Sequence, residues 1–304
     1  MACLVAADSA TASHEDVGTN EMKLAIITHR WDIFHSLPDW HPKGPRPSAY
    51  LLHDILECWR AMGNHWVMSS PTKRLEADAA FLHVVPTVVA PEYCAFANSY
   101  PYTINAETWD ITKRKVSLNL VDRDSDWAEP VIVKSDLNNF GKIEHLHNFR
   151  ARHFRQRPPH RNLPPPSDYQ VYDRLTDVPE VIWRDDRFVV EKFLPEDNGD
   201  GTFSLRTWVF LGERERCTRH IVPKSISKAD DVIRSEPCEI PQEIRDERTR
   251  LGFDYGKFDF VIHDGQPVLL DANRTPGNPR NLQDHVKKGA QNLAEGLDML
   301  VRAQ

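Results

Sequence analysis

The chain has 304 residues, of which 40% are hydrophobic and 27% are charged, and its formal net charge is -7. These proportions are near globular averages, which argues against global disorder and allows one large domain or two to three smaller ones. The negative charge argues against nucleic acid as the main partner, because neutralising phosphates requires a basic surface. No apolar run approaches the length of a membrane span, so no membrane association is expected.

The N-terminal segment and the cysteines predict a cytoplasmic protein. Residues 1–21 begin with a short apolar stretch without a positively charged region, so no signal peptide is expected. The rest of this segment is small, polar and acidic, and we expect it to be disordered, with structure beginning at Met22. The cysteines are scattered without a CxxC motif, which favours reduced thiols over disulfides or zinc ligands.

Residues 22–109 are predicted to form a first α/β domain. Lys23–Thr28 is an apolar, β-branched run typical of a strand. A helix is predicted over Ser48–Met62, with the serine as its N-cap and apolar residues at helical spacing. Further strands are predicted over His65–Met68 and Ala79–Val85. A βαβ unit of this kind favours a parallel sheet.

The next segment, residues 110–189, contains features expected around a polyphosphate. Lys113 and Lys115 belong to a run of cations that precedes an apolar stretch. Pro130–Lys134 is a predicted strand that ends on a lysine and leads into the turn-rich loop Ser135–Gly141. A lysine beside a flexible loop suits phosphate binding, although a solvent-facing strand end is the alternative.

An arginine-rich and proline-rich stretch follows this loop. Five arginines lie between Arg150 and Arg161, and prolines limit how far the segment can move. The stretch is interpreted as a lid over phosphates, as a nucleic-acid patch or as solvated surface, and the acidic net charge weakens the second interpretation. We adopt the lid as the working hypothesis.

Residues 190–304 are predicted to contain two β-hairpins and two helices. An apolar strand over Phe188–Leu194 leads into this region, and Leu205–Leu211 pairs with Cys217–Val222 in a hairpin. An amphipathic helix is predicted over Ile240–Leu251, and a closing helix over Asn281–Arg302. The apolar face of the closing helix comprises Val286, Leu293, Leu297 and Leu300.

A second hairpin places oxygen donors on two apolar runs. Asp271 and Asn273 share one face of their strand because side chains alternate with a period of two. Asp259 joins them if the loop has three residues with Gly265 in the left-handed conformation, whereas a two-residue loop would put the acids on opposite faces. Carboxylates on a rigid sheet suit a hard cation such as Mg2+. Polar residues on a solvent-facing side are the alternative interpretation.

The order of these features resembles the ATP-grasp superfamily from Met22 to the C-terminus. The matching motifs are PVIVK with Lys134, VVEKFLPE at Val189–Glu196, LRTWVF with Arg206, and FDF…LLDANRTPGN with the hairpin acids. The resemblance implies an α/β (α+β) architecture, in which an N-terminal α/β domain at 22–109 precedes two α+β subdomains at 110–189 and 190–304. ATP is expected between two antiparallel sheets.

The resemblance also implies roles for individual residues. Adenine would lie against Val190–Leu194. The backbone groups of Lys192 and Leu194 would form hydrogen bonds with its edge, and Phe193 lies between these two residues. Glu191 would face the exocyclic amine and Glu196 the ribose hydroxyls. The phosphate-binding lysines would be Lys134 and either Lys113 or Lys115. The metal ligands for Mg2+, with Mn2+ as a substitute, would be Asp259, Asp271 and Asn273, and Arg206 would stabilise the transferred phosphate.

The function implied is that of an ADP-producing carboxylate–amine ligase, which activates a small-molecule carboxylate as an acyl phosphate. A small-molecule kinase and a weakly catalytic nucleotide-binding module are the alternatives. The chain departs from the family pattern in two places, because Asp271 stands where glutamate is common and the phosphate loop has one glycine, Gly141. Substrate carboxylate binding is hypothesised for His29, Arg30, Arg274 and Arg280. A homodimer is left open.

Overall fold

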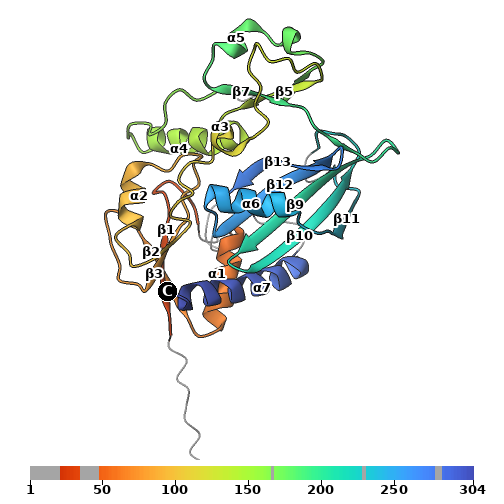
Figure 1. Ribbon diagram of the computed structural model, residues 1–304. Helices are drawn as coiled ribbons and strands as arrows, with labels where there is room; N and C mark the ends of the chain where they lie inside the picture. The colour runs from red at the N-terminus through yellow and green to blue at the C-terminus, as the bar shows by residue number, and fades with distance from the viewer. Residues whose placement is uncertain (1–20, 35–47, 166–167, 228–230, 278–282) are drawn as a thin grey trace, which may run out of the picture.

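The computed structural model describes residues 21–34, 48–165, 168–227, 231–277 and 283–304, except the side chains of 283–287. The disorder expected for residues 1–21 therefore lies outside the described residues, apart from Glu21. In the described part of the chain, three sheets and their helices form a mixed α/β architecture, which confirms the predicted fold class (Figure 1). No helix in this part is both long enough and apolar enough to cross a bilayer.

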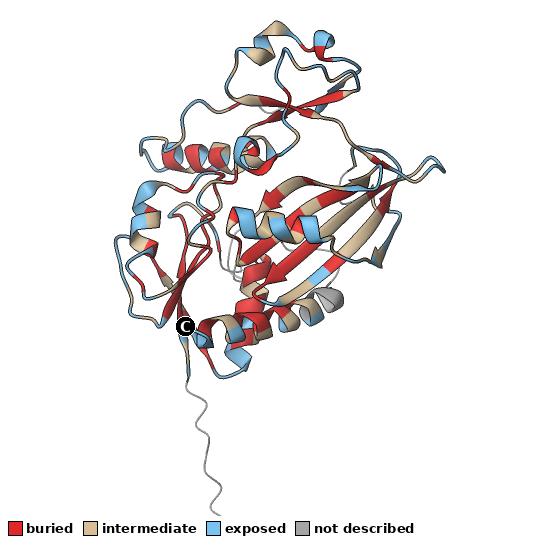
Figure 2. Ribbon diagram, viewed as in Figure 1, coloured by how far each residue is buried: buried red, intermediate tan, exposed pale blue. Residues whose placement is uncertain are grey.

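The first sheet is parallel, as the βαβ pattern predicted. It has four strands in the order β2-β1-β3-β4. The strands are β1 (Lys23–Ile27), β2 (His65–Ser69), β3 (Ala79–Leu82) and β4 (Thr103–Ile104). The helices of this part are α1 (Leu51–Ala61) and α2 (Pro91–Ala97). Strands β1 and β3 are almost entirely buried because helices and loops cover both faces of the sheet (Figure 2).

Helix α1 buries the apolar stripe that its spacing predicted. The buried residues are Leu51, Leu52, Ile55, Leu56 and Trp59. The predicted cap is wrong, because the helix begins after Tyr50. The hydroxyl of Ser48 instead donates to the carbonyl of Phe34 at 2.6 Å.

The second sheet has three antiparallel strands in the order β6-β5-β7. They are β5 (Val131–Ser135), β6 (Gln170–Tyr172) and β7 (Phe188–Lys192). The helices around it are α3 (Lys113–Val116), the 3-10 turns η1 (Asn138–Gly141) and η2 (Leu175–Asp177), α4 (Lys142–His153) and α5 (Glu180–Trp183). Since β7 pairs with β5 up to Lys192, the strand crosses the domain boundary expected at 189/190.

The third sheet is antiparallel and has six strands. Its strands are β8 (Glu196–Asp197), β9 (Phe203–Leu211), β10 (Arg214–Val222), β11 (Arg234–Pro237), β12 (Tyr255–His263) and β13 (Gln266–Asn273). The helices are α6 (Gln242–Leu251) and α7 (Gln283–Arg302). The predicted start of the last helix and Arg280 lie outside the described residues, and so does the side chain of Val286.

The first and third sheets share one hydrophobic core. Side chains of β1, α1, α7 and β9 belong to a single buried cluster, and α1 packs along α7 (Figure 1). The second sheet has its own smaller cluster around Val131 and Val190. This sheet lies at one end of the molecule (Figure 1). The second and third sheets therefore belong to units that pack separately and face each other across the space between them.

Candidate functional site

A cavity of about 230 Å³ lies between the second and third sheets. Most of the residues predicted for nucleotide and metal binding line it. They are Lys113, Lys134, Lys192, Phe193, Leu194, Glu196, Asp259 and Asp271. Residues 192–196 form the connection between the two sheets, so this segment borders the cavity from both units.

The two hairpin acids, Asp259 and Asp271, lie on the same face of the sheet, but the loop and the strand pairing that place them there differ from the prediction. The loop between β12 and β13 has two residues, Asp264 and Gly265, with φ of 48° and 78°. Two left-handed residues match a type I′ turn. A β-bulge between Asp259 and Phe260 then shifts the register, so that Asp259 pairs with Asp271. The three-residue loop is therefore wrong, and the bulge places the acids on one face.

Lysines neutralise both acids in this structure. The ammonium of Lys113 donates to Asp271, and that of Lys257 donates to Asp259 at 2.7 Å. Desolvation alone would lower the pKa of Lys113 and Lys257, but the attraction and hydrogen bonding of the carboxylates outweigh it and raise both pKa values. The sequence analysis missed Lys257, although its position two residues before Asp259 puts both side chains on one face of the strand.

The donor set fits a hard divalent cation. Asp259 and Asp271 are cross-strand neighbours that both line the cavity, and carboxylate oxygens are the ligands that Mg2+ prefers. Asn273 is different, because it does not line the cavity and its Oδ1 accepts the backbone N–H of Thr275 at 2.9 Å. Its role as a metal ligand stays a prediction.

Lys134 and Glu191 form a buried ion pair beneath the cavity. The ammonium of Lys134 donates to Glu191 Oε2 at 2.7 Å, and both side chains are at most 10% exposed. Glu191 Oε1 is buried and has no hydrogen-bond partner. Because Glu191 lies opposite Ile132, which lines the cavity, this unpaired acceptor faces the cavity side of the sheet. An unpaired buried acceptor is costly, so a ligand donor here would stabilise it.

The structure distinguishes the two lysines that the sequence could not. Lys113 is buried at the start of α3 and lines the cavity. Lys115 is exposed and does not line the cavity. The geometry therefore favours Lys113 as the first phosphate-binding lysine.

Arg206 lies outside the cavity and is bound to Glu196. Its Nη2 and Nε donate to the two oxygens of Glu196 at 2.7 and 3.0 Å, and the N–H of Ile262 donates to the same carboxylate at 2.7 Å. Desolvation favours a higher pKa for Glu196, but these bonds outweigh it and lower the pKa. The predicted roles of Arg206 at the phosphate and Glu196 at the ribose would require this pair to rearrange.

The phosphate loop is strained and touches the cavity through an unpredicted tyrosine. Asn139 and Phe140 have φ of 47° and 54°, which is uncommon for residues other than glycine. The Phe140 ring lies 5.0 Å from the ring of Tyr169, whose centroid is 6.0 Å from the ammonium of Lys134. Tyr169 lines the cavity, but its polar neighbourhood in the sequence carried no signal of this role.

Two hypotheses about substrate-binding residues are not supported by the positions of their side chains. Arg274 is fully buried, and its guanidinium donates to four backbone carbonyl groups. The acceptors belong to Val84, Pro86, Thr87 and Thr108. His29 is buried against His147. Arg30 is exposed, and Arg280 lies outside the described residues.

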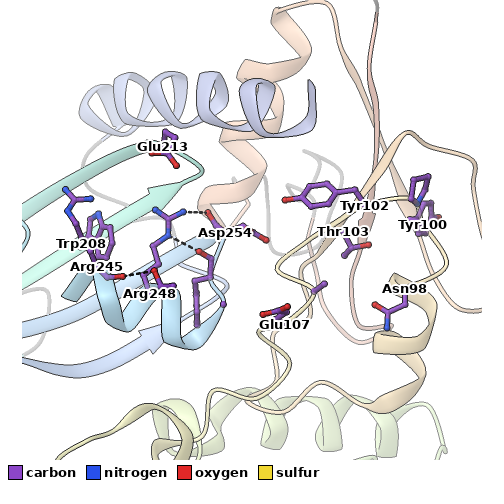
Figure 3. Close-up of a pocket in the computed structure, with 15 residues that line it drawn as sticks. Asn98, Tyr100, Tyr102, Thr103, Glu107, Trp208, Glu213, Arg245, Arg248 and Asp254 are labelled. Carbon is purple, nitrogen blue, oxygen red and sulfur yellow. Dashed lines mark hydrogen bonds between the residues drawn. The ribbon is translucent and has the colours of Figure 1, made fainter. Parts of the chain in front are cut away.

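A larger cavity of about 810 Å³ lies elsewhere, between α6 and the region of β4. Figure 3 shows Arg245 and Arg248 on one side and Tyr102 and Thr103 on the other. Both arginines are engaged, since Arg245 pairs with Glu215 and Arg248 donates to backbone carbonyls. None of the residues predicted for nucleotide or metal lines this cavity, so its size alone does not make it the site.

No family model matches the sequence, and neither does any curated protein sequence. The chain is similar to the RimK domain protein ATP-grasp from Sphaerobacter thermophilus, with 13% identity, coverage of 90% of this chain and 98% of that chain, and a TM-score of 0.47. D-alanine–D-alanine ligase from Bacillus anthracis complexed with ATP is 13% identical, with coverage of 93% of this chain and 99% of that chain and a TM-score of 0.47. The ATP-grasp ligase PsnB complexed with minimal precursor, Mg and ADP is 12% identical, with coverage of 91% of this chain and 97% of that chain and a TM-score of 0.47. At these TM-scores the similarity carries no inference about activity, so the function has to be inferred from the cavity.

Proposed function

We propose that this chain is an ATP-dependent ligase of the ATP-grasp superfamily, which activates a carboxylate as an acyl phosphate for attack by an amine. One observation carries the proposal: two lysines, two carboxylates and the connection between two sheets, all predicted from sequence motifs, line a single cavity. These residues are far apart in the sequence, so their convergence is not a consequence of local structure.

The nucleotide would lie along the connection between the sheets. Its base would face residues 192–194, where the unpaired Glu191 Oε1 is an acceptor for the exocyclic amine. Its phosphates would extend towards Lys113 and Lys134, and Mg2+ would be held by Asp259 and Asp271. The cavity is smaller than the roughly 300–1,000 Å³ of typical small-molecule sites, so the sheets would separate to admit ATP.

The residues at the cavity supply what phosphoryl transfer requires. The reaction needs little covalent chemistry from the protein, mainly positioning and neutralisation of the phosphate oxygens. Lys113 and Lys257 now neutralise the acids, and with a cation at Asp259 and Asp271 their ammonium groups would be free to bind the phosphates. Mg2+ held by the two acids would offset the charge of the phosphates.

A nucleotide-binding module with little catalysis is the second candidate. The loop with the strained Asn139 and Phe140 has one glycine, and the contact between Phe140 and Tyr169 holds it against the cavity. A loop fixed in this way would exchange nucleotide slowly. The small-molecule kinase is the third candidate, and it differs from the ligase because its reaction stops after phosphoryl transfer.

Single-turnover assays of ADP release distinguish these functions. A ligase releases ADP only when both an acid and an amine are present, a kinase releases it with one acceptor, and a module binds ATP without releasing ADP. Libraries of small carboxylates and amines are screened with the wild type and the variant Asp259→Asn. The proposal fails if ADP release is independent of the amine, or if the variant is as active as the wild type.

A further inference from the structure

Three histidines meet at a place that the proposed function does not use. His29 follows β1, His147 lies on α4, and His160 belongs to the segment after α4. One ring nitrogen of each lies within 4.8 Å of the corresponding nitrogens of the other two. His29 and His147 are buried and His160 is partly buried. None of the three lines the cavity between the second and third sheets.

The spacing of one pair of nitrogens matches that of two ligands on a tetrahedral metal ion. His147 Nδ1 and His160 Nε2 are 3.3 Å apart. Two nitrogens that each lie about 2.0–2.1 Å from a tetrahedral zinc ion are separated by roughly 3.4 Å. The Nδ1 atom of His29 accepts the N–H of Trp31 at 3.2 Å, which leaves its Nε2 as the nitrogen available for a ligand.

A buried carboxylate orients the central histidine. Asp32 Oδ1 lies 2.7 Å from His147 Nε2, and these two side chains are 2% and 1% exposed. A carboxylate that accepts the second N–H of a histidine is the usual support of a metal-binding imidazole, because it fixes the tautomer and the orientation of the ring. It leaves Nδ1 of His147 as the nitrogen with a lone pair, and this nitrogen faces His160.

The other two histidines are also held in position. Asn148 clamps the backbone of His160, since its amide donates to the His160 carbonyl at 2.8 Å and its Oδ1 accepts the His160 N–H at 3.0 Å. The ring of His29 is parallel to that of His147, with centroids 4.3 Å apart. The His29 ring would therefore have to tilt out of this stacked arrangement to direct Nε2 at the same ion.

The surroundings admit an ion. A cavity of about 330 Å³ borders His160 and provides an entry path. A set of imidazole nitrogens without thiolates suits Zn2+, Cu2+ or Ni2+ better than Mg2+.

We propose that His29, His147 and His160 bind one zinc ion, which fastens α4 and the segment after it to the C-terminal end of β1. Three protein ligands leave the fourth position of the tetrahedron to water. The ion would cross-link elements more than a hundred residues apart, and it is separate from the Mg2+ expected at Asp259 and Asp271.

The test is metal binding by the full chain without a histidine tag. Chelator-treated protein is titrated with Zn2+ by calorimetry and with Co2+ by visible absorption. We expect one tight site per chain and the absorption of tetrahedral Co2+. The variant His160→Ala should lose this site, and Asp32→Asn should bind about 10–100-fold more weakly. His153→Ala is the matched control, because His153 is exposed on the same helix.

The proposal is overturned if the wild type binds no zinc, or if His160→Ala binds it as tightly as the wild type. The second outcome would place the ion elsewhere, for example at Asp259 and Asp271. If His160→Ala does not fold, the visible spectrum of Co2+ bound to the wild type identifies the site. Co2+ held in a tetrahedron by imidazole nitrogens absorbs strongly, whereas Co2+ with six oxygen ligands absorbs weakly. None of these measurements depends on ligase activity.

Discussion

Asp259 and Asp271 are directly opposite each other on β12 and β13, because a β-bulge beside Phe260 offsets the two-residue loop of the hairpin. Without the bulge, the pairing would place them on opposite faces of the sheet. Like charges on cross-strand neighbours destabilise a sheet, and here Lys113 and Lys257 neutralise them. The proposed cation would offset the same repulsion in place of the two lysines.

The first prediction concerns the metal site. Asp271→Asn should reduce ATP-dependent ADP release to background, because the remaining carboxylate cannot hold the cation alone. The variant should also melt several degrees lower, since the buried Lys113 loses its counter-charge. Activity is therefore measured below the melting temperature of both proteins. Asp264→Asn, in the exposed turn, is the control that should change neither quantity, and an active Asp271→Asn would contradict the metal assignment.

The second prediction concerns the phosphates. Lys134→Ala alone would leave Glu191 charged and buried, so the loss of stability would obscure the result. The double variant Lys134→Met with Glu191→Gln removes both charges. It should bind ATP about 10–100-fold more weakly, which corresponds to roughly 1.5–3 kcal/mol for a charged hydrogen bond.

Adenosine binding is the internal reference, because it lacks the phosphates. It should change much less than ATP binding in the double variant, because the amide oxygen of glutamine at position 191 can still accept a hydrogen bond from the exocyclic amine. Lys115→Met, at an exposed lysine outside the cavity, should leave both affinities unchanged. Equal losses for ATP and adenosine would show that the strand is disrupted and that Lys134 has no specific role at the phosphates.

The sequence predicted the elements better than the contacts between them. Periodicity identified the buried stripe of α1 and the strand β5 that contains Lys134, because these patterns depend on the local spacing of apolar residues. The bulge beside Asp259 has no local signature, since Leu270 looks like any apolar strand residue. The sequence around Arg274 is also typical of a surface arginine. Its carbonyl acceptors lie more than 160 residues away in the chain, so no local pattern indicates its burial.

The third prediction concerns Arg274 as a structural residue. Arg274→Met should lower the free energy of unfolding by at least about 3 kcal/mol, because it leaves several buried carbonyl groups unpaired. Arg274→Lys should recover only part of this loss, since an ammonium cannot span the same acceptors. Arg184→Ala, at an exposed arginine, should cost less than about 1 kcal/mol. Denaturant unfolding measures all three, and an Arg274→Met variant as stable as the wild type would contradict this structural role.

The fourth prediction concerns pH. His83 is fully buried, both ring nitrogens lack hydrogen-bond partners, and desolvation lowers its pKa to about 3. The unfolded state takes up the proton below pH 6.5 and the folded state does not. Stability should therefore fall as the pH decreases from 6.5 towards 3, by up to about 1.4 kcal/mol per pH unit from this residue.

His83→Phe should flatten this dependence, because phenylalanine does not titrate and neighbouring rings already pack around this position. His153→Phe is the control, since His153 is exposed. Unfolding is measured by denaturant at intervals between pH 7 and pH 4.5. An unchanged slope in His83→Phe would show that His83 is protonated in the folded state or that it becomes accessible.

The last prediction revises the lid hypothesis for residues 150–161. None of the arginines of this segment lines the cavity, and both ends of the segment contact other parts of the chain. The guanidinium of Arg150 donates to the carbonyl of Trp31, and His160 contacts His147 on α4. A segment held in this way cannot close over phosphates without releasing both contacts. We therefore expect trypsin to cut after the exposed Arg155 and Arg161 at the same rate with and without an ATP analogue and Mg2+. Slower cutting in the presence of nucleotide would restore the lid, because protection would then require the segment to move onto the bound phosphates.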